Sequence, residues 1–385
     1  MTTPPEPQRA AAQAADERWM KAALALAARG LGETWPNPSV GCVLVDRAGR
    51  LIARGRTQPG GRPHAEAAAL ARAAETQAGA RRLEGATAYV TLEPCSHHGR
   101  TPPCAEALAA ARVGRVLAAI EDPDPRVSGR GLAHLRSQGI DAAAGLCAAA
   151  AEAVLEGYLL RQRAGRPRLT LKLAASLDGR IGTALGESRW ITGEAARRRV
   201  HLLRARSDAV LIGAGTARAD DPMLDARLAG LERPRTARLV ADPSLSLDPA
   251  SRLAASATAQ PVWLLHSRNA PEAKRAALAA QGCRLLEIPA APTSGLDPSA
   301  MLQALGDEGV TAVLCEGGGA LAASLLRAGL VDRLIWVIAG AALGAEARPG
   351  LGALGIERLA TAPRFERVAA EAVGADLWTE WRPLR

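Results

Sequence analysis

The chain has 385 residues and a formal net charge of +9. This length favours two domains over one core, and a hydrophobic content of 48% is enough to pack both. The positive charge favours anionic partners such as nucleic acid, a membrane surface or a phosphorylated small molecule. Aromatic residues make up only 3% and do not alternate with basic ones, which argues against a platform that stacks single-stranded nucleic acid.

The six cysteines are too few for a disulfide framework in so long a chain. Cys42 and Cys315 lie in apolar, strand-like runs and are expected to be small buried residues. The first residues lack the pattern of a secretory signal, and no apolar run is long enough to span a membrane. We therefore expect a cytoplasmic protein without a membrane partner.

The first half alternates between helix and strand patterns. Residues 1–12 form a Pro- and Ala-rich tail that is expected to be disordered, and the runs 40–45 and 51–54 predict a hairpin. Helical patterns follow at 16–29, 64–75, 105–112, 131–138 and 148–163, and further strands at 86–92 and 116–120. This alternation predicts a mixed or parallel sheet with helices on its faces.

A basic segment at 161–167 is the expected boundary, which gives domains at 13–163 and 167–385. The second half begins with a strand at 168–175, and Thr192 is expected to cap a helix that ends near residue 206. Further strands are predicted at 209–212, 237–241, 261–266, 283–288, 310–315 and 334–338, with helices at 271–281, 299–307 and 319–329. The second domain is therefore also expected to be α/β.

A His-Ala-Glu sequence at 64–66 and the cysteines at 95 and 104 carry the strongest chemical signal. One imidazole and two thiols suit zinc, and three protein ligands leave a fourth position for water, as in catalytic sites. Glu66 points in a different direction from His64 on a helix, so it can carry protons beside the metal. This pattern is typical of zinc deaminases, although here eight residues separate the cysteines. The competing interpretation is a structural zinc site closed by His97 or His98.

Three glycines at 317–319 lie between a strand and an apolar helix. Such a turn lets a phosphate approach the backbone and the helix N-terminus, although a plain tight turn is nearly as common. A second glycine turn, at 213–218, imitates a dinucleotide fingerprint but has Arg218 in place of the third glycine. We therefore do not predict a Rossmann domain.

Taken together, these motifs resemble the bifunctional riboflavin-biosynthesis deaminase/reductase family (RibD type). The resemblance covers nearly the whole chain beyond the tail. It is carried by the motifs at 64–66, 91–104, 170–179, 188–192, 213–222 and 316–319, in matching order. It implies a cytidine-deaminase-like zinc domain followed by a dihydrofolate-reductase-like domain. It also implies deamination of a phosphoribosylamino-pyrimidine, followed by NADPH-dependent reduction of its ribosyl group.

The resemblance also implies the roles of individual residues. Zinc is expected on His64, Cys95 and Cys104, with Glu66 as the catalytic acid and base. The deaminase substrate is expected to contact Asn37, His97 and Arg100, the last standing where the family usually has Lys. Expected NADPH contacts are Ala174, Trp190, Thr216, Asp220, Ser244, Gly318, Gly319, Ala320, Leu321, Ala322, Ala323 and Ser324. Expected contacts of the reductase substrate are Ser188, Arg204, Leu224, Arg227 and Glu316. At Asp124 the family commonly has Asn, so this residue is left out of the site.

Two other functions compete with this hypothesis. One is a zinc deaminase that acts on a nucleoside or on tRNA, in which the basic charge serves nucleic acid. The other is a zinc-stabilised module that binds a phosphorylated ligand without catalysis. The second domain and the wide cysteine spacing favour the bifunctional enzyme, acting on phosphorylated pyrimidines without nucleic acid. We further expect a homo-oligomer.

Overall fold

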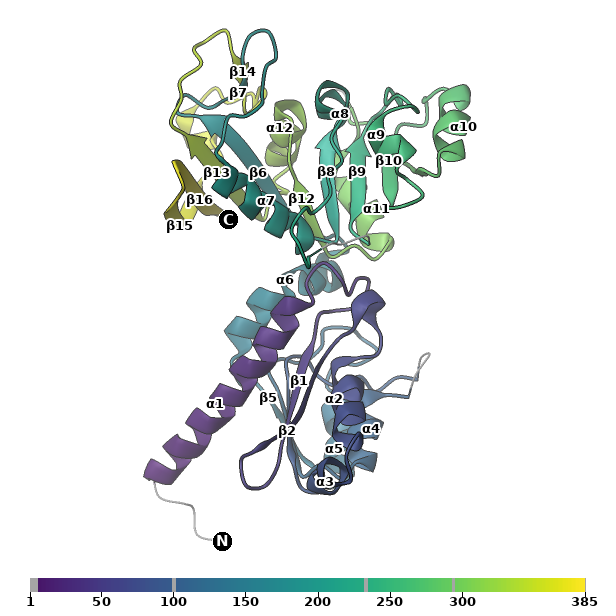
Figure 1. Cartoon of the computed structure of the whole chain (residues 1–385), viewed down its shortest axis with the longest axis vertical. Coiled ribbons are helices and arrows are strands. Elements are labelled where there is room, and N and C mark those ends of the chain that lie inside the picture. The colour runs from purple at the N-terminus through teal and green to yellow at the C-terminus, as the bar shows by residue number, and fades with distance from the viewer. Residues whose placement is uncertain (1–5, 99–101, 232–234, 293–294, 385) are drawn as a thin grey trace. The chain divides into compact units, whose positions relative to one another are not determined.

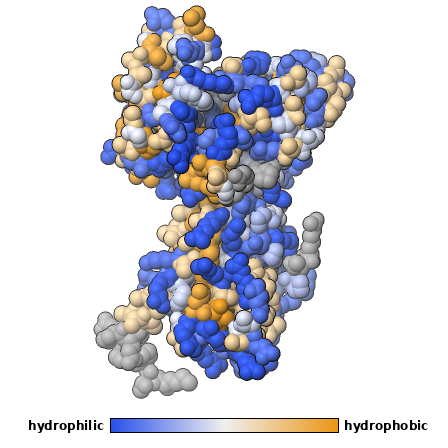
Figure 2. Space-filling model, viewed as in Figure 1, coloured by the Kyte–Doolittle hydropathy of each residue, from blue (hydrophilic) through white to orange (hydrophobic). Residues whose placement is uncertain are grey.

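The computed structural model describes residues 6–98, 102–231, 235–292 and 295–384 (Figure 1). Contacts within the chain divide it into two units, Met1–Ala164 and Gly165–Arg385. Within the described ranges, none of the helices has the length and apolar character that crossing a membrane requires. Hydrophilic side chains cover most of the face of each unit shown in Figure 2, with apolar ones scattered among them.

The first unit is built on a five-stranded sheet with the order β2-β1-β3-β4-β5. Its strands are β1 (Gly41–Val45), β2 (Leu51–Arg56), β3 (Thr87–Val90), β4 (Arg115–Ala118) and β5 (Asp141–Ala144). β1 pairs antiparallel with β2 and β3, and β3, β4 and β5 run parallel. The hairpin and the mixed sheet predicted from the sequence are therefore confirmed.

Helices cover both faces of this sheet (Figure 1). They are α1 (Glu6–Arg29), α2 (Ala65–Ala74), α3 (Gln77–Arg82), α4 (Cys104–Ala110), α5 (Arg130–Ser137) and α6 (Ala148–Ala164), with a 3-10 turn at Pro59–Gly61. Alternate residues of β1 serve the two faces, as the two-residue period of a strand requires. Cys42 and Leu44 pack with α2, α4 and α5, whereas Val43 and Val45 pack with α1. The sheet thus fixes α2 and α4, whose first turns carry metal-ligand candidates.

Three elements of the first unit differ from the prediction. The tail expected to be disordered is helical from Glu6 onward, because its alanines are strong helix formers and need no apolar stripe. The prediction missed α3, a six-residue helix that contains Gly79 and is capped by Thr76. It also missed β5, whose Asp-Ala-Ala-Ala sequence has no β-branched residue.

The second unit holds a nine-stranded sheet with the order β11-β10-β9-β8-β12-β6-β13-β16-β15. Its strands are β6 (Arg168–Ser176), β8 (Ala209–Gly213), β9 (Ala237–Ala241), β10 (Val262–His266), β11 (Arg284–Glu287), β12 (Ala312–Cys315), β13 (Arg333–Ala339), β15 (Phe365–Val373) and β16 (Asp376–Pro383). The strands from β11 to β13 run parallel, and β16 and β15 continue the sheet antiparallel. β7 (Arg180–Gly182) and β14 (Arg348–Pro349) form a separate pair. Cys315 in β12 and Cys42 in β1 are fully buried, as expected.

The helices of this unit are α7 (Glu194–Ala205), α8 (Ala214–Asp220), α9 (Arg252–Ala255), α10 (Glu272–Ala280), α11 (Pro298–Asp307) and α12 (Gly319–Arg327), with a 3-10 turn at Leu359–Thr361. The expectation that Thr192 caps α7 is wrong. Gly193 is the N-cap, and its N–H donates to Asp376 Oδ2 at 2.7 Å. The prediction also missed α8, α9 and the β15–β16 hairpin. Most residues of β15 are exposed, so the strand lacks an apolar run.

Candidate active sites

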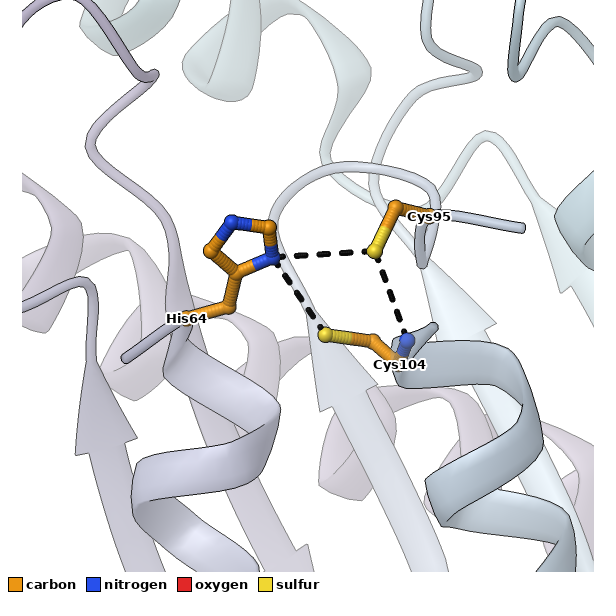
Figure 3. Close-up of side chains that lie close together, drawn as sticks. All are labelled: His64, Cys95 and Cys104. Atoms are coloured by element: carbon orange, nitrogen blue, oxygen red, sulfur yellow. Dashed lines mark hydrogen bonds between the residues drawn. The ribbon is translucent and has the colours of Figure 1, made fainter. Parts of the chain in front are cut away.

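The side chains of His64, Cys95 and Cys104 in the first unit point toward one another (Figure 3). His64 is the residue before α2, Cys95 lies in the loop that follows β3, and Cys104 is the first residue of α4. His64 Nδ1 lies 3.6 Å from Cys95 Sγ and 3.5 Å from Cys104 Sγ. The backbone N–H of Cys104 donates to Cys95 Sγ at 3.3 Å, which favours a thiolate at Cys95.

These separations fit a tetrahedral metal site. Ligands at the usual Zn–N and Zn–S lengths, about 2.1 and 2.3 Å, lie roughly 3.6 Å apart at a tetrahedral zinc ion. All three ligand atoms lie within 4.8 Å of one another, and no other described His, Cys, Asp or Glu joins the cluster. His98 instead pairs with Glu106, with 3.0 Å between Nε2 and Oε1. The donor set therefore fits an ion with an open fourth position.

Glu66 is the second residue of α2 and is 4% exposed. Burial, reinforced by the negative charge of Cys95, raises the pKa of Glu66 to about 7. The hydrogen bond with Cys104 lowers the pKa of Cys95 to about 4, and the same interaction raises the pKa of Cys104. The two sulfurs thus compete for one proton, which a metal ion displaces when it binds both as thiolates.

A cavity of about 300 Å³ opens beside this cluster. Asn37 and His97, two predicted substrate contacts, line it together with Glu66. Asn37 Nδ2 donates to Gly61 O at 3.0 Å, which fixes its amide. His97 Nδ1 is buried without a hydrogen-bond partner in the described structure, as expected of a group that awaits a ligand. The third predicted contact, Arg100, lies outside the described residues.

Sequence reasoning missed the far wall of this cavity. The wall contains Asp122, Asp124, Arg126, Tyr158 and Arg161, of which only Asp124 was considered from the sequence, and it was left out of the site. The Tyr158 hydroxyl donates to both carboxylate oxygens of Asp122, at 2.9 and 3.2 Å. Burial raises the pKa of Asp122 to about 6. Arg126 pairs with Asp124 and holds the pKa of that carboxyl below its usual range.

In the second unit, two helices begin at neighbouring strand ends. β8 leads into α8 and β12 leads into α12, and these two strands are paired in the sheet. Gly213 and Gly318 are the N-caps of the two helices, and neither cap makes a side-chain hydrogen bond. Free N–H groups at such ends suit a phosphate. A Cβ at Gly318 would lie 3.0 Å from Thr216 Oγ1, so only glycine leaves the turn open.

A cavity of about 600 Å³ lies over these helix starts. Its lining contains most of the predicted NADPH contacts, namely Thr216, Asp220, Gly318, Gly319, Ala320, Leu321, Ala323 and Ser324. Ala322 is instead fully buried in the core, and Ser244 is not part of the lining, although its neighbour Pro243 is. The size of the cavity and its two helix N-termini fit a dinucleotide with a pyrophosphate.

A second cavity of about 500 Å³ adjoins the first. Ser188, Thr216, Asp220 and Gly318 line both cavities. The other predicted contacts in this cavity are Ala174, Trp190, Arg204, Leu224, Arg227 and Glu316. A cofactor in one cavity and a substrate in the other therefore meet at a shared wall, which is the arrangement that hydride transfer requires.

Charged groups are buried at the base of the second cavity. Arg204 Nε and Nη2 donate to the two carboxylate oxygens of Glu316 at 2.6 and 2.8 Å. Burial tends to raise the pKa of Glu316, but the Arg204 guanidinium holds it below its usual value. Lys172, on β6, is a further lining residue, and burial lowers its pKa. The prediction missed Lys172, although a lone lysine in an apolar strand was a signal. It also missed His201, which has no distinctive pattern.

Comparison with known proteins matches each unit to a family model. Residues 13–120 match the cytidine and deoxycytidylate deaminase zinc-binding region, and residues 167–379 match the RibD C-terminal domain. The riboflavin biosynthesis protein RibD of Escherichia coli is 44% identical over 380 residues, which cover 94% of this chain and 98% of that protein.

Two solved structures resemble the whole chain. RibD of Acinetobacter baumannii has a TM-score of 0.85 at 38% identity, covering 97% of this chain and 100% of its own. A diaminohydroxyphosphoribosylaminopyrimidine deaminase/5-amino-6-(5-phosphoribosylamino)uracil reductase of Thermotoga maritima has a TM-score of 0.83 at 30% identity, covering 97% and 99%.

Fold, sites and similarities define an enzyme that joins a cytidine-deaminase-like zinc domain to a reductase domain. The chain belongs to the RibD family, the bifunctional deaminases and reductases of riboflavin biosynthesis. Zinc and NADPH are the cofactors of its two activities. The fold, the activities and the cofactors predicted from the sequence are thereby confirmed.

Proposed function

We propose that residues 13–163 deaminate a diaminohydroxyphosphoribosylaminopyrimidine, and that residues 167–385 then reduce the ribosyl group of the resulting amino-phosphoribosylamino-uracil to ribityl. The observation that carries this proposal is the convergence of His64, Cys95 and Cys104 beside the buried Glu66. The Thermotoga relative is named for both reactions, which supports the assignment of one to each unit. The two adjoining cavities of the second unit support the reductive step.

In the first site, His64, Cys95 and Cys104 would hold a zinc ion, which would supply a polarised water. Glu66 would accept a proton from this water as its oxygen bonds to the amino-bearing carbon, and would deliver the proton to the amino group as the C–N bond breaks and ammonia leaves. Its burial beside the ligand cluster supports this role. Asn37 and His97 orient the pyrimidine, and Arg100 is a further candidate for this contact. The unpartnered Nδ1 of His97 supports its assignment.

In the second site, NADPH supplies the hydride. The N–H groups at the starts of α8 and α12 would hold its pyrophosphate. The remaining proposed cofactor contacts are Ala174, Trp190, Thr216, Asp220, Ser244 and the residues from Gly318 to Ser324. Ala322 and Ser244 have the weakest structural support, because neither lines the cofactor cavity.

The reductase substrate occupies the cavity that contains Arg204, Arg227 and Glu316, with Ser188 and Leu224 as further contacts. The arginines bind the phosphate. Hydride addition to the ribose carbon requires a proton on the ring oxygen, which becomes a hydroxyl as the ring opens. The ammonium group of Lys172, which lines the cavity and whose pKa is lowered by burial, is suited to supply that proton.

We further propose that the protein works in the cytoplasm as a homo-oligomer and takes small phosphorylated pyrimidines rather than nucleic acid. All six cysteines are free, which is consistent with a reducing compartment.

The test uses the full chain with its zinc content measured and follows ammonia release and NADPH oxidation in one reaction. Glu66→Gln should lower ammonia release at least about 100-fold while zinc and reduction of the deaminated substrate persist. Glu75→Gln, an exposed change at the end of the same helix, is the matched control and should behave as wild type.

Three results would contradict the proposal. Normal ammonia release by Glu66→Gln would remove the assigned catalytic role. No turnover of the pyrimidine phosphate, together with tight tRNA binding that falls steeply with salt, would favour the nucleic-acid alternative. Consumption of the deaminated product without NADPH oxidation would remove the reductive step.

A further inference from the structure

The segment from Asp221 to Arg227 carries two of the proposed substrate contacts but has no regular secondary structure. Leu224 has a φ of +55°, in the left-handed region that leucine rarely adopts, and its side chain is buried in the core. Arginine side chains outside the segment donate hydrogen bonds to two of its backbone carbonyl groups. Arg238 Nη1 donates to Met223 O at 3.3 Å, and Arg204 Nη1 donates to Asp225 O at 3.0 Å. The path of the segment thus depends on its neighbours.

His201 provides the next support along this segment. It lies on α7, three residues before Arg204, and both line the substrate cavity. His201 Nδ1 lies 3.2 Å from Asp225 O and 3.3 Å from the backbone nitrogen of Arg227. The Arg227 side chain is 60% exposed and reaches Asp225 Oδ1 only at 3.4 Å. The place of its guanidinium therefore depends on the backbone that His201 holds.

We propose that His201 is a positioning residue for the reductase reaction: it holds the backbone of Arg227 so that the guanidinium meets the substrate phosphate. This inference rests on the proposed assignment of the cavity to a phosphorylated substrate. His201 acts through Arg227 and takes no part in hydride transfer.

Only the neutral imidazole that carries its proton on Nε2 can hold Arg227 in this way, because Nδ1 must accept the Arg227 N–H. A protonated ring donates from Nδ1 instead, and Asp225 O is the acceptor within reach. The charged groups that face the ring are Arg204 on α7, Asp225 and Arg227 on the segment, and Glu316 after β12. Burial, followed by the charge of Arg204, lowers the pKa of His201, so the ring is mainly neutral at neutral pH, as the holding form requires.

Two variants separate this role from simple packing. His201→Leu keeps a bulky side chain without an acceptor, whereas His201→Gln offers an amide oxygen that can accept the Arg227 N–H but cannot take up a proton. Arg198→Gln is the matched control, because Arg198 is an exposed cation of the same helix outside the cavity lining.

Steady-state kinetics of the full chain measures KM and kcat for the deaminated phosphorylated substrate, with inorganic phosphate as a competing probe. His201→Leu should raise this KM and the Ki of phosphate roughly three- to ten-fold, as expected for one lost hydrogen bond. The kcat value and the KM for NADPH should stay within about two-fold, and His201→Gln should restore the substrate KM. As pH falls below the usual imidazole pKa of about 6.5, KM should rise more for wild type than for His201→Gln. The substrate phosphate also titrates in this range, but it affects both proteins equally. The ratio of the wild-type KM to the His201→Gln KM therefore reports on His201 alone.

An unchanged KM in His201→Leu would overturn the inference, and so would an equal loss in His201→Gln or a matching rise in the KM for NADPH. If His201→Leu does not fold, the pH dependence of the ratio between wild type and His201→Gln still decides: a flat ratio overturns the inference. Failure of the underlying assignment looks different, because the wild-type chain would then not oxidise NADPH with this substrate at all.

Discussion

Substitutions in the buried ion pair of the reductase unit should destabilise it unequally. The side chains of Arg204 and Glu316 are 12% and 11% exposed, and the half-buried Lys172 interacts with both charges. The three groups therefore carry two positive charges and one negative charge. Glu316→Gln leaves two cations with Asp225 as a remaining anion near Arg204 only, whereas Arg204→Met leaves Glu316 with Lys172 as a remaining partner. We expect Glu316→Gln to be the more harmful change.

The burial and the remaining partners of each group determine how much unfolding free energy each substitution should remove. Removing one partner of a buried pair costs about 3–5 kcal/mol when the other is left uncompensated, which applies to Glu316→Gln. Arg204→Met should cost about 1–3 kcal/mol, because a charge partner remains and mainly hydrogen bonds are lost. For a unit of this size each kcal/mol lowers Tm by about 2–4 °C. The expected decreases are thus roughly 6–20 °C and roughly 2–12 °C.

Scanning calorimetry of the full chain measures both decreases, with the transition of the zinc-bearing unit as an internal reference. The pH dependence supplies a second check. Burial lowers the pKa of Lys172 and the charge of Glu316 partly offsets this effect, so Glu316→Gln lowers the pKa further and makes stability rise more with pH than in wild type. The loss in Glu316→Gln should therefore shrink between pH 7 and pH 9. Equal losses, or a larger loss in Arg204→Met, would show that Lys172 does not share the charge of Glu316.

Three further predictions concern zinc, the cofactor turn and a buried acid. A chelator should abolish ammonia release but leave NADPH oxidation with the deaminated substrate within about two-fold, and added zinc should restore the lost activity. Gly319→Ala places a Cβ 2.9 Å from Pro349 O, so we expect the KM for NADPH to rise by about ten-fold. Gly340→Ala, whose Cβ meets nothing within 4 Å, should leave that KM unchanged. Asp122→Asn should stabilise the first unit by about 1–3 kcal/mol at pH 8, measured by urea unfolding. The gain should fade as pH decreases through 6 toward 4, because burial raises the pKa of Asp122 to about 6 and the folded acid retains its proton there.

The metal cluster could be predicted because its ligands, one histidine and two cysteines, are residue types that typically bind zinc. A histidine, two cysteines and a nearby glutamate indicate a zinc site even when the fold of the chain between them is unknown. The structure brings His64, Cys95 and Cys104 together as this pattern requires. Most strands and helices were also predictable, because their apolar periods are long enough to recognise.

The walls of the cavities could not be predicted in the same way. Some lining residues come from elements whose positions only the fold determines. Examples are Lys172 on β6, His201 on α7 and Tyr158 on α6. Whether such a residue lines a cavity depends on the order of the strands in the sheet. The order of the nine-stranded sheet, with β12 between β8 and β6, follows from packing over more than 100 residues of chain. Exposed elements such as β15 were also not predicted, because most of their residues are exposed and their sequences therefore lack a periodic apolar pattern.

The late position of β12 in the chain has a consequence for incomplete products of translation. A nascent chain that stops before residue 312 contains β6 and β8 but lacks the strand that pairs with both. The edges of β6 and β8 that normally pair with β12 are then left without a partner. Their unpaired N–H and C=O groups can pair with strands of other molecules. Premature termination in this region should therefore produce aggregating fragments rather than a shorter working enzyme.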